Sequence, residues 1–308
     1  MTLIVNIVTP EGIIMASDSR QSERNIKQFT RISTNSANKL FSLNDRVIVA
    51  TAGLAFFADS SGIRKNVSEY IESFKKENNL ENLTVDEISA KLHEYINIKY
   101  PWEKQLDISA QQLEIDAERN GEKILSLERN VDSIEFKIKQ PSGRIKEGHL
   151  NIEPVNLLVS GYNADGTSET YEINSPGKRI IKRANNEFGC TWIGQGDVVS
   201  RLILGYDSNL FKIQTIKSLN KKSIDELHSQ VHGLEYYIQW SLLTLQDAVD
   251  LAVFLIKTTS FLQRYTDGIS MDIGDIQGVG GPVDVVLITK DEIRWINKKE
   301  IGISDHMI

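Results

Sequence analysis

Thr2 directly follows the initiator methionine, so removal of Met1 would leave a threonine that carries both a hydroxyl and a free α-amine. A hydroxyl is a poor nucleophile at neutral pH unless a base lies within hydrogen-bond reach. The α-amine has a reference pKa of about 7.7 to 8.0, so an appreciable fraction is neutral near pH 7 and can accept the hydroxyl proton. Thr2 could therefore carry out acyl transfer with its own base. Because many chains begin Met-Thr, its significance depends on the residues that follow.

Two hydrophobic alternations, residues 3–9 and 13–17, flank the turn-forming sequence Pro10-Glu11-Gly12. This pattern predicts a β-hairpin. A hairpin returns the chain to its starting point, so Asp18 and Arg20 are expected beside Thr2.

A second hairpin is predicted from residues 39–43 and 46–51, with its turn at Asn44-Asp45. Lys39 opens this hairpin, and Gly53 lies at its end, in the sequence Ala-Gly-Leu-Ala, where a helix is expected to begin.

These segments resemble, in order and spacing, the β subunits of proteasomes and the related bacterial heat-shock peptidase, which are N-terminal nucleophile (Ntn) hydrolases. The resemblance rests on the start Thr-x-x-Val-x-Ile-Val, the strand Gly-Ile-Ile-Met-Ala-Ser-Asp-Ser-Arg, and the Lys-Leu-Phe and Ala-Gly-Leu-Ala sequences. It resumes at residues 157–162, 194–196 and 280–290. It implies an α+β fold, a four-layer αββα sandwich of two antiparallel sheets flanked by helices, as one domain over residues 1–308.

The resemblance also assigns roles to single residues. Thr2 would be the nucleophile and its amine the general base, while the Lys39 ammonium would lower the pKa of both groups by favouring their deprotonated forms. Asp18 would keep Lys39 charged and in place, and Arg20 would support that pair. The backbone N–H of Gly53 would donate to the oxyanion. Taken singly, each residue also has an ordinary structural interpretation, such as a surface ion pair or a helix-entry glycine.

By the same resemblance, Gln21, Thr51 and Ala55 would line a small, uncharged primary specificity pocket. Three supporting positions depart from the family pattern. Gln195 and Val279 stand where active members have serine, and the expected aspartate falls on Ile276, where its neighbour Asp275 could substitute.

Helical periodicity predicts helices around residues 63–74, 85–96 and 245–265, with a further helix after Gly196. Two stretches, about 101–150 and 207–243, exceed what the resemblance needs. The first is expected to hold a hairpin or short helix at 123–139. The second is expected to hold an amphipathic helix capped by Ser223 and Glu226, followed by exposed aromatic residues, Tyr236, Tyr237 and Trp240. Each could form a subunit interface or a lid, or be a decorated loop.

Composition narrows the functional class. The chain has 308 residues, of which 40% are apolar, a net charge of −7 and a single cysteine, Cys190. These features argue against an intrachain disulfide framework and nucleic-acid binding, and they suit the cytoplasm. No segment predicts a membrane span, and no glycine-rich loop predicts a nucleotide cofactor. His228 and His232 have the i, i+4 spacing of metal ligands, but a surface helix face is the more typical interpretation, so no metal and no cofactor are expected.

Three functions remain open. The first is a threonine peptidase that hydrolyses peptides or unfolded proteins within a homo-oligomeric ring, with an ATP-dependent unfoldase or another activator as a conceivable partner. The second is an Ntn amidohydrolase acting on a small amide, which the changes at Gln195 and Val279 suggest. The third is a catalytically inactive ring that serves as a scaffold.

Overall fold

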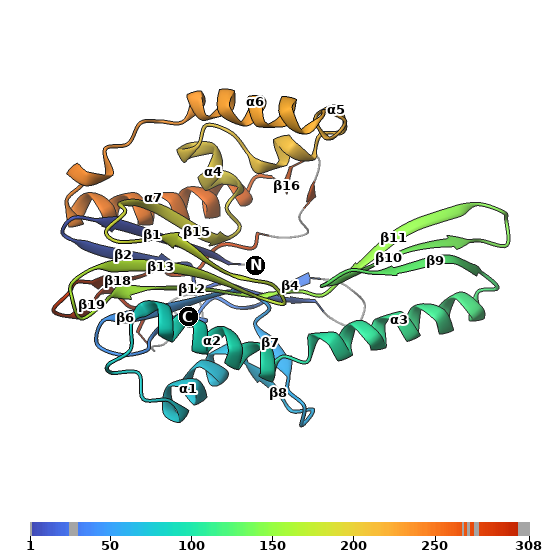
Figure 1. The fold of residues 1–308 in the computed structure, drawn as a ribbon, viewed down its shortest axis with the longest axis horizontal. Helices are drawn as coiled ribbons and strands as arrows, with labels where there is room; N and C mark the ends of the chain where they lie inside the picture. Colours follow the sequence, from blue (N-terminus) through green and yellow to red (C-terminus); the bar gives the residue numbers. More distant parts are fainter. Residues whose placement is uncertain (1, 25–29, 267, 270–271, 274–276, 301–308) are drawn as a thin grey trace, which may run out of the picture.

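The computed structural model describes residues 2–24, 30–266, 268–269, 272–273 and 277–300. It has a mixed α/β fold whose centre consists of two antiparallel sheets of five strands each (Figure 1). The first sheet has the strand order β15-β1-β2-β18-β19. Its strands are β1 (Leu3–Thr9), β2 (Gly12–Ser17), β15 (Gly189–Gly194), β18 (Asp284–Ile288) and β19 (Ile293–Asn297).

The second sheet has the strand order β14-β13-β12-β6-β5. Its strands are β5 (Leu40–Ser42), β6 (Val47–Gly53), β12 (Val155–Tyr162), β13 (Ser168–Ser175) and β14 (Arg179–Arg183). Both hairpins predicted from the N-terminal sequence are therefore confirmed: β1 pairs with β2 in one sheet, and β5 pairs with β6 in the other.

Apolar side chains fill the space between the two sheets and the space outside each of them. Ile4, Met15, Ile48 and Leu158 belong to the cluster between the sheets. A second cluster joins the β6–β12–β13 side to the helices over residues 67–77 and 85–99, and a third joins the β1–β2–β18 side to the helices over residues 197–203 and 245–263. Because β1 and β2 are covered on both faces, every residue in them is buried, and this explains their nearly continuous apolar sequence.

The packed helices are α1 (Val67–Glu77), α2 (Val85–Lys99), α4 (Asp197–Ile203) and α7 (Leu245–Gln263). Helix α2 begins with a capping box, in which Thr84 and Glu87 each accept a hydrogen bond from the other's backbone N–H. None of the described helices is both long and apolar enough to cross a bilayer.

The prediction that a helix begins directly after Gly53 is wrong. A short hairpin, β7 (Phe56–Ala58) and β8 (Arg64–Asn66), comes first, and Ile63 is exposed in its turn region. Helix α1 begins only at Val67, because Asn66 forms a capping box with Glu69 that satisfies the first free N–H groups of the helix.

The first inserted stretch forms an arm that projects from the body, with one long helix packed along a three-stranded sheet (Figure 1). Its elements are α3 (Trp102–Arg119), β9 (Lys123–Arg129), β10 (Ser133–Lys139) and β11 (Ile145–Asn151). Alternate residues of β10, namely Ile134, Phe136 and Ile138, are buried, as expected for a sheet covered on one face. Of the two forms anticipated for residues 123–139, the structure has the hairpin.

The second inserted stretch is helical and lies on the α4 and α7 side of the molecule (Figure 1). Its elements are η1 (Ser208–Lys212), α5 (Gln214–Lys217), α6 (Lys221–Val231), η2 (His232–Leu234) and η3 (Trp240–Leu242). The predicted capping role of Ser223 is wrong: the cap of α6 is Asn220, whose side chain accepts from the Ser223 N–H. Tyr236 and Tyr237 are exposed as predicted, whereas Trp240 is half-buried against the third cluster.

Two further strand pairs complete the described elements. They are β3 (Gln21–Arg24) with β4 (Thr30–Thr34), and β16 (Gly268–Ile269) with β17 (Asp272–Ile273).

Candidate active site

Asp18 and Lys39 form a buried ion pair beside the N-terminal end of β1. The Lys39 Nζ lies 2.7 Å from the Asp18 Oδ1 and donates a second hydrogen bond, 2.6 Å long, to the carbonyl of Arg20. The side chain of Asp18 is fully buried and that of Lys39 is 6% exposed. Two charges are kept so far from water only where they are paired and hydrogen-bonded.

The Asp18 carboxylate is held by three backbone N–H groups in addition to Lys39. Its Oδ1 accepts from Leu3 at 3.0 Å, and its Oδ2 accepts from Arg20 at 3.1 Å and from Gly280 at 3.0 Å. The β1–β2 hairpin supplies the first contact, because it brings the end of β2 back to the start of β1. The predicted return of Asp18 to the neighbourhood of Thr2 is therefore confirmed.

Opposing influences act on the pKa of Lys39. Burial lowers its pKa, and the nearby cations Lys299 and Arg20 lower it further, whereas the Asp18 carboxylate raises it. Loss of Asp18 would therefore leave only influences that favour neutral Lys39.

Arg20 contributes mainly through its backbone. Its N–H and carbonyl hold Asp18 and Lys39, while its guanidinium donates to Asn35 at 2.8 Å and to the Gln277 carbonyl at 3.3 Å. Burial lowers the pKa of Arg20, and Asp18 opposes that effect.

Thr2 is 7% exposed and lies where β1 meets β15. Its carbonyl accepts from the Gln195 N–H at 2.7 Å, and Leu3 pairs with Gly194 in the strand register. Gly194 has φ +88°, and a Cβ there would lie 2.0 Å from the Thr2 carbonyl oxygen, so only glycine permits this approach. The backbone of Thr2 is thus held tightly.

Thr2 and Lys39 line one cavity of about 630 Å³. The cavity wall also includes all three predicted specificity residues, Gln21, Thr51 and Ala55. Its farther part is charged, because Glu23, Arg64 and Glu153 contribute to it. Glu23 is ion-paired with Arg64 at 3.8 Å. Sequence reasoning missed this farther part, which includes residues at the root of the arm.

Gly53 lies on the same cavity wall and has φ +73°. A Cβ at this position would lie 2.2 Å from the Pro154 carbonyl oxygen. Glycine is therefore required here by the close approach of the neighbouring backbone after the arm, and the oxyanion role of the Gly53 N–H stays a prediction.

Two of the altered supporting positions, Gln195 and Val279, are linked in the structure by hydrogen bonds through Gln263. The Gln195 Oε1 accepts from the Gln263 Nε2 at 2.7 Å, and the Gln263 Oε1 accepts from the N–H of Val279 at 2.9 Å. Val279 itself is buried in the cluster beneath α7. Asp275 and Ile276 lie outside the described residues. Gln263 was not predicted, since it carries no local motif.

Sequence reasoning also missed a second buried ion pair. Asp284, at the start of β18, pairs with Lys299, and its Oδ1 accepts from the Lys299 N–H at 2.9 Å. Asp284 faces Ser17 across the β2–β18 pairing, so this pair lies one strand from the Asp18–Lys39 pair.

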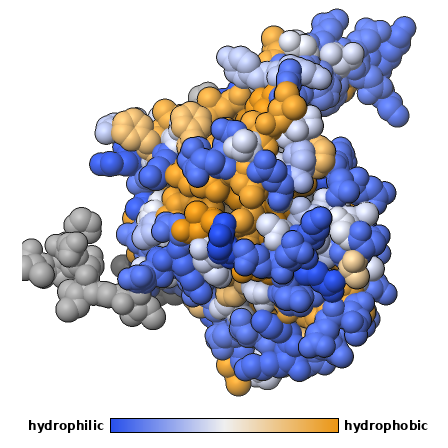
Figure 2. Space-filling model, turned by 90° about the vertical axis from the view of Figure 1, so that its left-hand side faces the viewer, coloured by the Kyte–Doolittle hydropathy of each residue, from blue (hydrophilic) through white to orange (hydrophobic). Residues whose placement is uncertain are grey.

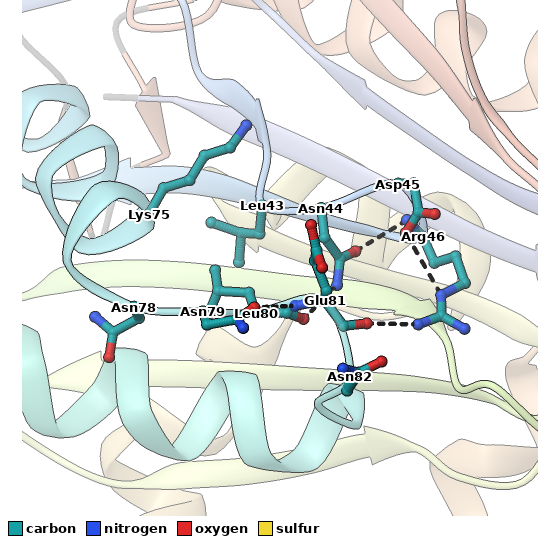
Figure 3. Close-up of a pocket in the computed structure, with 10 residues that line it drawn as sticks. All are labelled: Leu43, Asn44, Asp45, Arg46, Lys75, Asn78, Asn79, Leu80, Glu81 and Asn82. Carbon is teal, nitrogen blue, oxygen red and sulfur yellow. Dashed lines mark hydrogen bonds and ion pairs between the residues drawn. The ribbon is translucent and has the colours of Figure 1, made fainter.

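A second cavity, of about 620 Å³, lies between the β5–β6 turn and the α1–α2 loop (Figure 3). Its walls are tied together: the Asn44 side chain donates to the Leu80 carbonyl, and the Arg46 guanidinium donates to the Glu81 carbonyl, both at 2.9 Å. Thr2 does not line it. We interpret the hydrogen-bonded walls of this cavity as a structural connection between the two loops.

Other candidate residues proved structural. Cys190 is buried, and burial raises the pKa of its thiol to about 12, so it is a poor nucleophile. His228 stacks on Phe211, with ring centroids 3.9 Å apart. Among the residues that the structure describes, no group of His, Cys, Asp or Glu side chains has the arrangement of a metal site.

Comparison with known proteins agrees with this geometry. The family model described as proteasome subunit matches residues 2–136, a stretch that includes Thr2, Asp18, Lys39 and Gly53. No curated protein matches the chain. The more specific likeness to the bacterial heat-shock peptidase remains a prediction. The family match confirms the resemblance inferred from the sequence: over residues 2–136 the chain is similar to proteasome subunits.

Proposed function

We propose that the chain is a threonine peptidase of the proteasome type, with Thr2 as its nucleophile after removal of Met1. The observation that carries the proposal is the buried Asp18–Lys39 pair beside the start of β1, whose lysine lines the same cavity as Thr2. A buried, backbone-anchored ammonium beside an N-terminal threonine favours deprotonation of both the hydroxyl and the amine.

In the proposed reaction, the Thr2 Oγ1 bonds to the peptide carbonyl carbon while its α-amine takes the hydroxyl proton. The C–N bond then breaks, the leaving amine receives that proton, and water hydrolyses the resulting ester. The Gly53 N–H would donate to the oxyanion, a contribution of about 3 to 4 kcal/mol in other hydrolases. Gln21, Thr51 and Ala55 would contact the side chain at the cleaved bond.

The extent of the Thr2 cavity wall favours a peptide over a small amide. The volume of about 630 Å³ is ordinary for a ligand site, but segments from β3 to the root of the arm contribute the wall, so an extended chain could contact several of them. Peptides and unfolded proteins are therefore the proposed substrates, and an unfoldase or activator that delivers them is the proposed partner.

We propose the four-layer sandwich of the family as the architecture, with residues 1–308 as one domain, and a homo-oligomeric ring in the cytoplasm as the assembly. Exposed apolar side chains support association. Figure 2 shows apolar residues gathered into one area on a side of the molecule. In addition, four large apolar side chains are exposed on or just after α7: Phe254, Phe261, Leu262 and Tyr265. Apolar surface of this kind is typical of an interface.

A substrate screen separates peptide cleavage from small-amide hydrolysis. Fluorogenic peptides and simple acyl amides would be compared at equal concentration, followed by digestion of a peptide library. We expect kcat/KM for peptides to exceed that for acyl amides by at least about a hundredfold, because the remote contacts stabilise only the longer substrate. We also expect small uncharged side chains at the cleaved bond. Preferential cleavage of acyl amides would contradict the proposal, and a preference for basic side chains would contradict the pocket assignment.

A further inference from the structure

Gln263, the last residue of α7, connects that helix to the loop that holds Asp18. The Gln263 Oε1 accepts from the N–H groups of Gly278 and Val279, at 3.1 and 2.9 Å. Its Nε2 donates to the Gln195 Oε1 at 2.7 Å. A second glutamine, Gln277, fastens the same loop to α7 through Ser260, without a hydrogen bond to Gln195 among those described.

The direction of these hydrogen bonds is fixed by chemistry. A backbone N–H can only donate, so the atom of Gln263 that faces Gly278 and Val279 must be its oxygen. Its amide nitrogen therefore faces Gln195, and the Gln195 side chain must present its oxygen to Gln263. The usual ambiguity of amide orientation is thus removed for both glutamines.

These contacts close a ring of hydrogen bonds around Thr2. On one side, the Gln195 N–H donates to the Thr2 carbonyl, and the Gln195 side chain leads to Gln263. On the other side, the N–H of Leu3, the next residue after Thr2, donates to Asp18. The Gly280 N–H also donates to Asp18, from the loop that Gln263 holds. The ring consists of Thr2, Gln195, Gln263, residues 278–280, Asp18 and Leu3.

We propose that Gln263 is a positioning residue that fixes the backbone of Thr2 relative to Asp18 and Lys39, acting through Gln195. It would supply support at the two positions, 195 and 279, where active family members have serine, using a side-chain amide at one position and a backbone N–H at the other. The expected effect of Gln263 on catalysis rests on the proposed function, whereas its expected effect on the order of the N-terminal residues does not.

The substitution Gln263→Glu tests the polarity of the ring. A carboxylate still accepts from Gly278 and Val279, but it cannot donate to Gln195, whose amide must turn over so that its nitrogen donates instead. The hydrogen bonds of residue 263 to Gln195, Gly278 and Val279 are kept in number while the orientation of Gln195 is reversed. We expect kcat to fall about ten- to a hundredfold, with KM changed less than about threefold, because misplaced reacting groups affect mainly the transition state.

Two further variants separate this effect from added charge and from lost stability. In a Gln195→Met background, Gln263→Glu should change kcat less than about threefold, because the side chain through which it acts is gone; an undiminished loss would mean a pure charge effect and would overturn the proposal. Gln277→Met removes the other tie between the loop and α7. It should lower stability comparably to Gln263→Met but leave kcat within about threefold, and an equal loss of kcat in both would also overturn the proposal.

Hydrogen–deuterium exchange gives a readout that does not need turnover. Gln263→Met should speed amide exchange in a peptide that covers residues 2–8, whereas Gln277→Met should leave that exchange unchanged. If the wild-type protein cleaves nothing but shows this exchange pattern, the peptidase proposal fails and the positioning role stands. If the protein is active and neither exchange nor kcat responds to Gln263, the positioning role fails alone.

Discussion

Thr2→Ala is expected to reduce peptide hydrolysis to background, a loss of at least about 10³-fold, because among the described residues at the Lys39 site only Thr2 would carry both a hydroxyl and a free α-amine once Met1 is removed. Removal of the nucleophile costs about 10⁶-fold in kcat in another hydrolase. Thr2 is buried, and the hydrogen bond from the Gln195 N–H reaches its backbone carbonyl, which alanine also has. The folded subunit and its assembly should therefore survive the substitution. Peptide turnover and static light scattering would be measured on the same sample.

Thr2→Ser is the matched control, since serine retains both the hydroxyl and the amine. It should keep measurable turnover. Hydrolysis by Thr2→Ala at a rate close to that of the wild type would show that another group is the nucleophile. A monodisperse monomer in the light-scattering measurement, for either protein, would overturn the ring assembly.

Asp18→Asn is expected to affect both stability and activity. The substitution leaves Lys39 buried without a counter-ion and places an NH₂ group among four donors, so the free energy of unfolding should fall by about 3 to 5 kcal/mol. The kcat of the folded fraction should fall about 10²-fold or more, which is the size of loss expected when a group that assists proton transfer is removed. Denaturant unfolding and kcat would be measured together.

The same variant has a signed pH prediction. Asp18 is the group that raises the pKa of Lys39, and burial, Lys299 and Arg20 lower it. In Asp18→Asn the pKa of Lys39 therefore falls further, and charged Lys39 is lost at a lower pH than in the wild type. If activity requires the ammonium, the alkaline limb of the kcat profile moves to lower pH. An alkaline limb at an unchanged pH would contradict the role of Lys39.

Asp284→Asn provides the matched control. Asp284 is also buried and paired with a lysine, Lys299, which lies near enough to lower the pKa of Lys39 but has no described hydrogen bond to Asp18 or Lys39. The substitution should destabilise the protein comparably while reducing kcat much less. Equal losses of kcat in the two variants would mean that Asp18 acts through stability alone.

The sequence predicted the parts of the site that depend on local pattern. The alternation of residues 3–9 and the Pro-Glu-Gly turn set the β1–β2 hairpin, and the hairpin alone brings Asp18 to Leu3. The start of α1 was mispredicted because Ile63 matched the helical period. The Asn66–Glu69 capping box was a local signal that could have corrected it.

The rest of the site depends on contacts between distant segments. Gln263 and Gln195 are 68 positions apart, and no periodicity or motif marks either of them as a partner of the other. The cavity wall at Pro154 likewise follows from where the arm returns to the body. Such pairings are set by the packing of the sheets and α7, which one sequence does not reveal.

Intact mass spectrometry tests most directly whether Thr2 is an N-terminal nucleophile. The purified protein would be measured with and without an electrophile that traps N-terminal threonines, beside Thr2→Ala. We predict a mass lower than the full sequence by one methionine, and one adduct per chain that is absent from the variant. A chain that retains Met1 and forms no adduct would contradict the account, because a blocked amine cannot serve as the base.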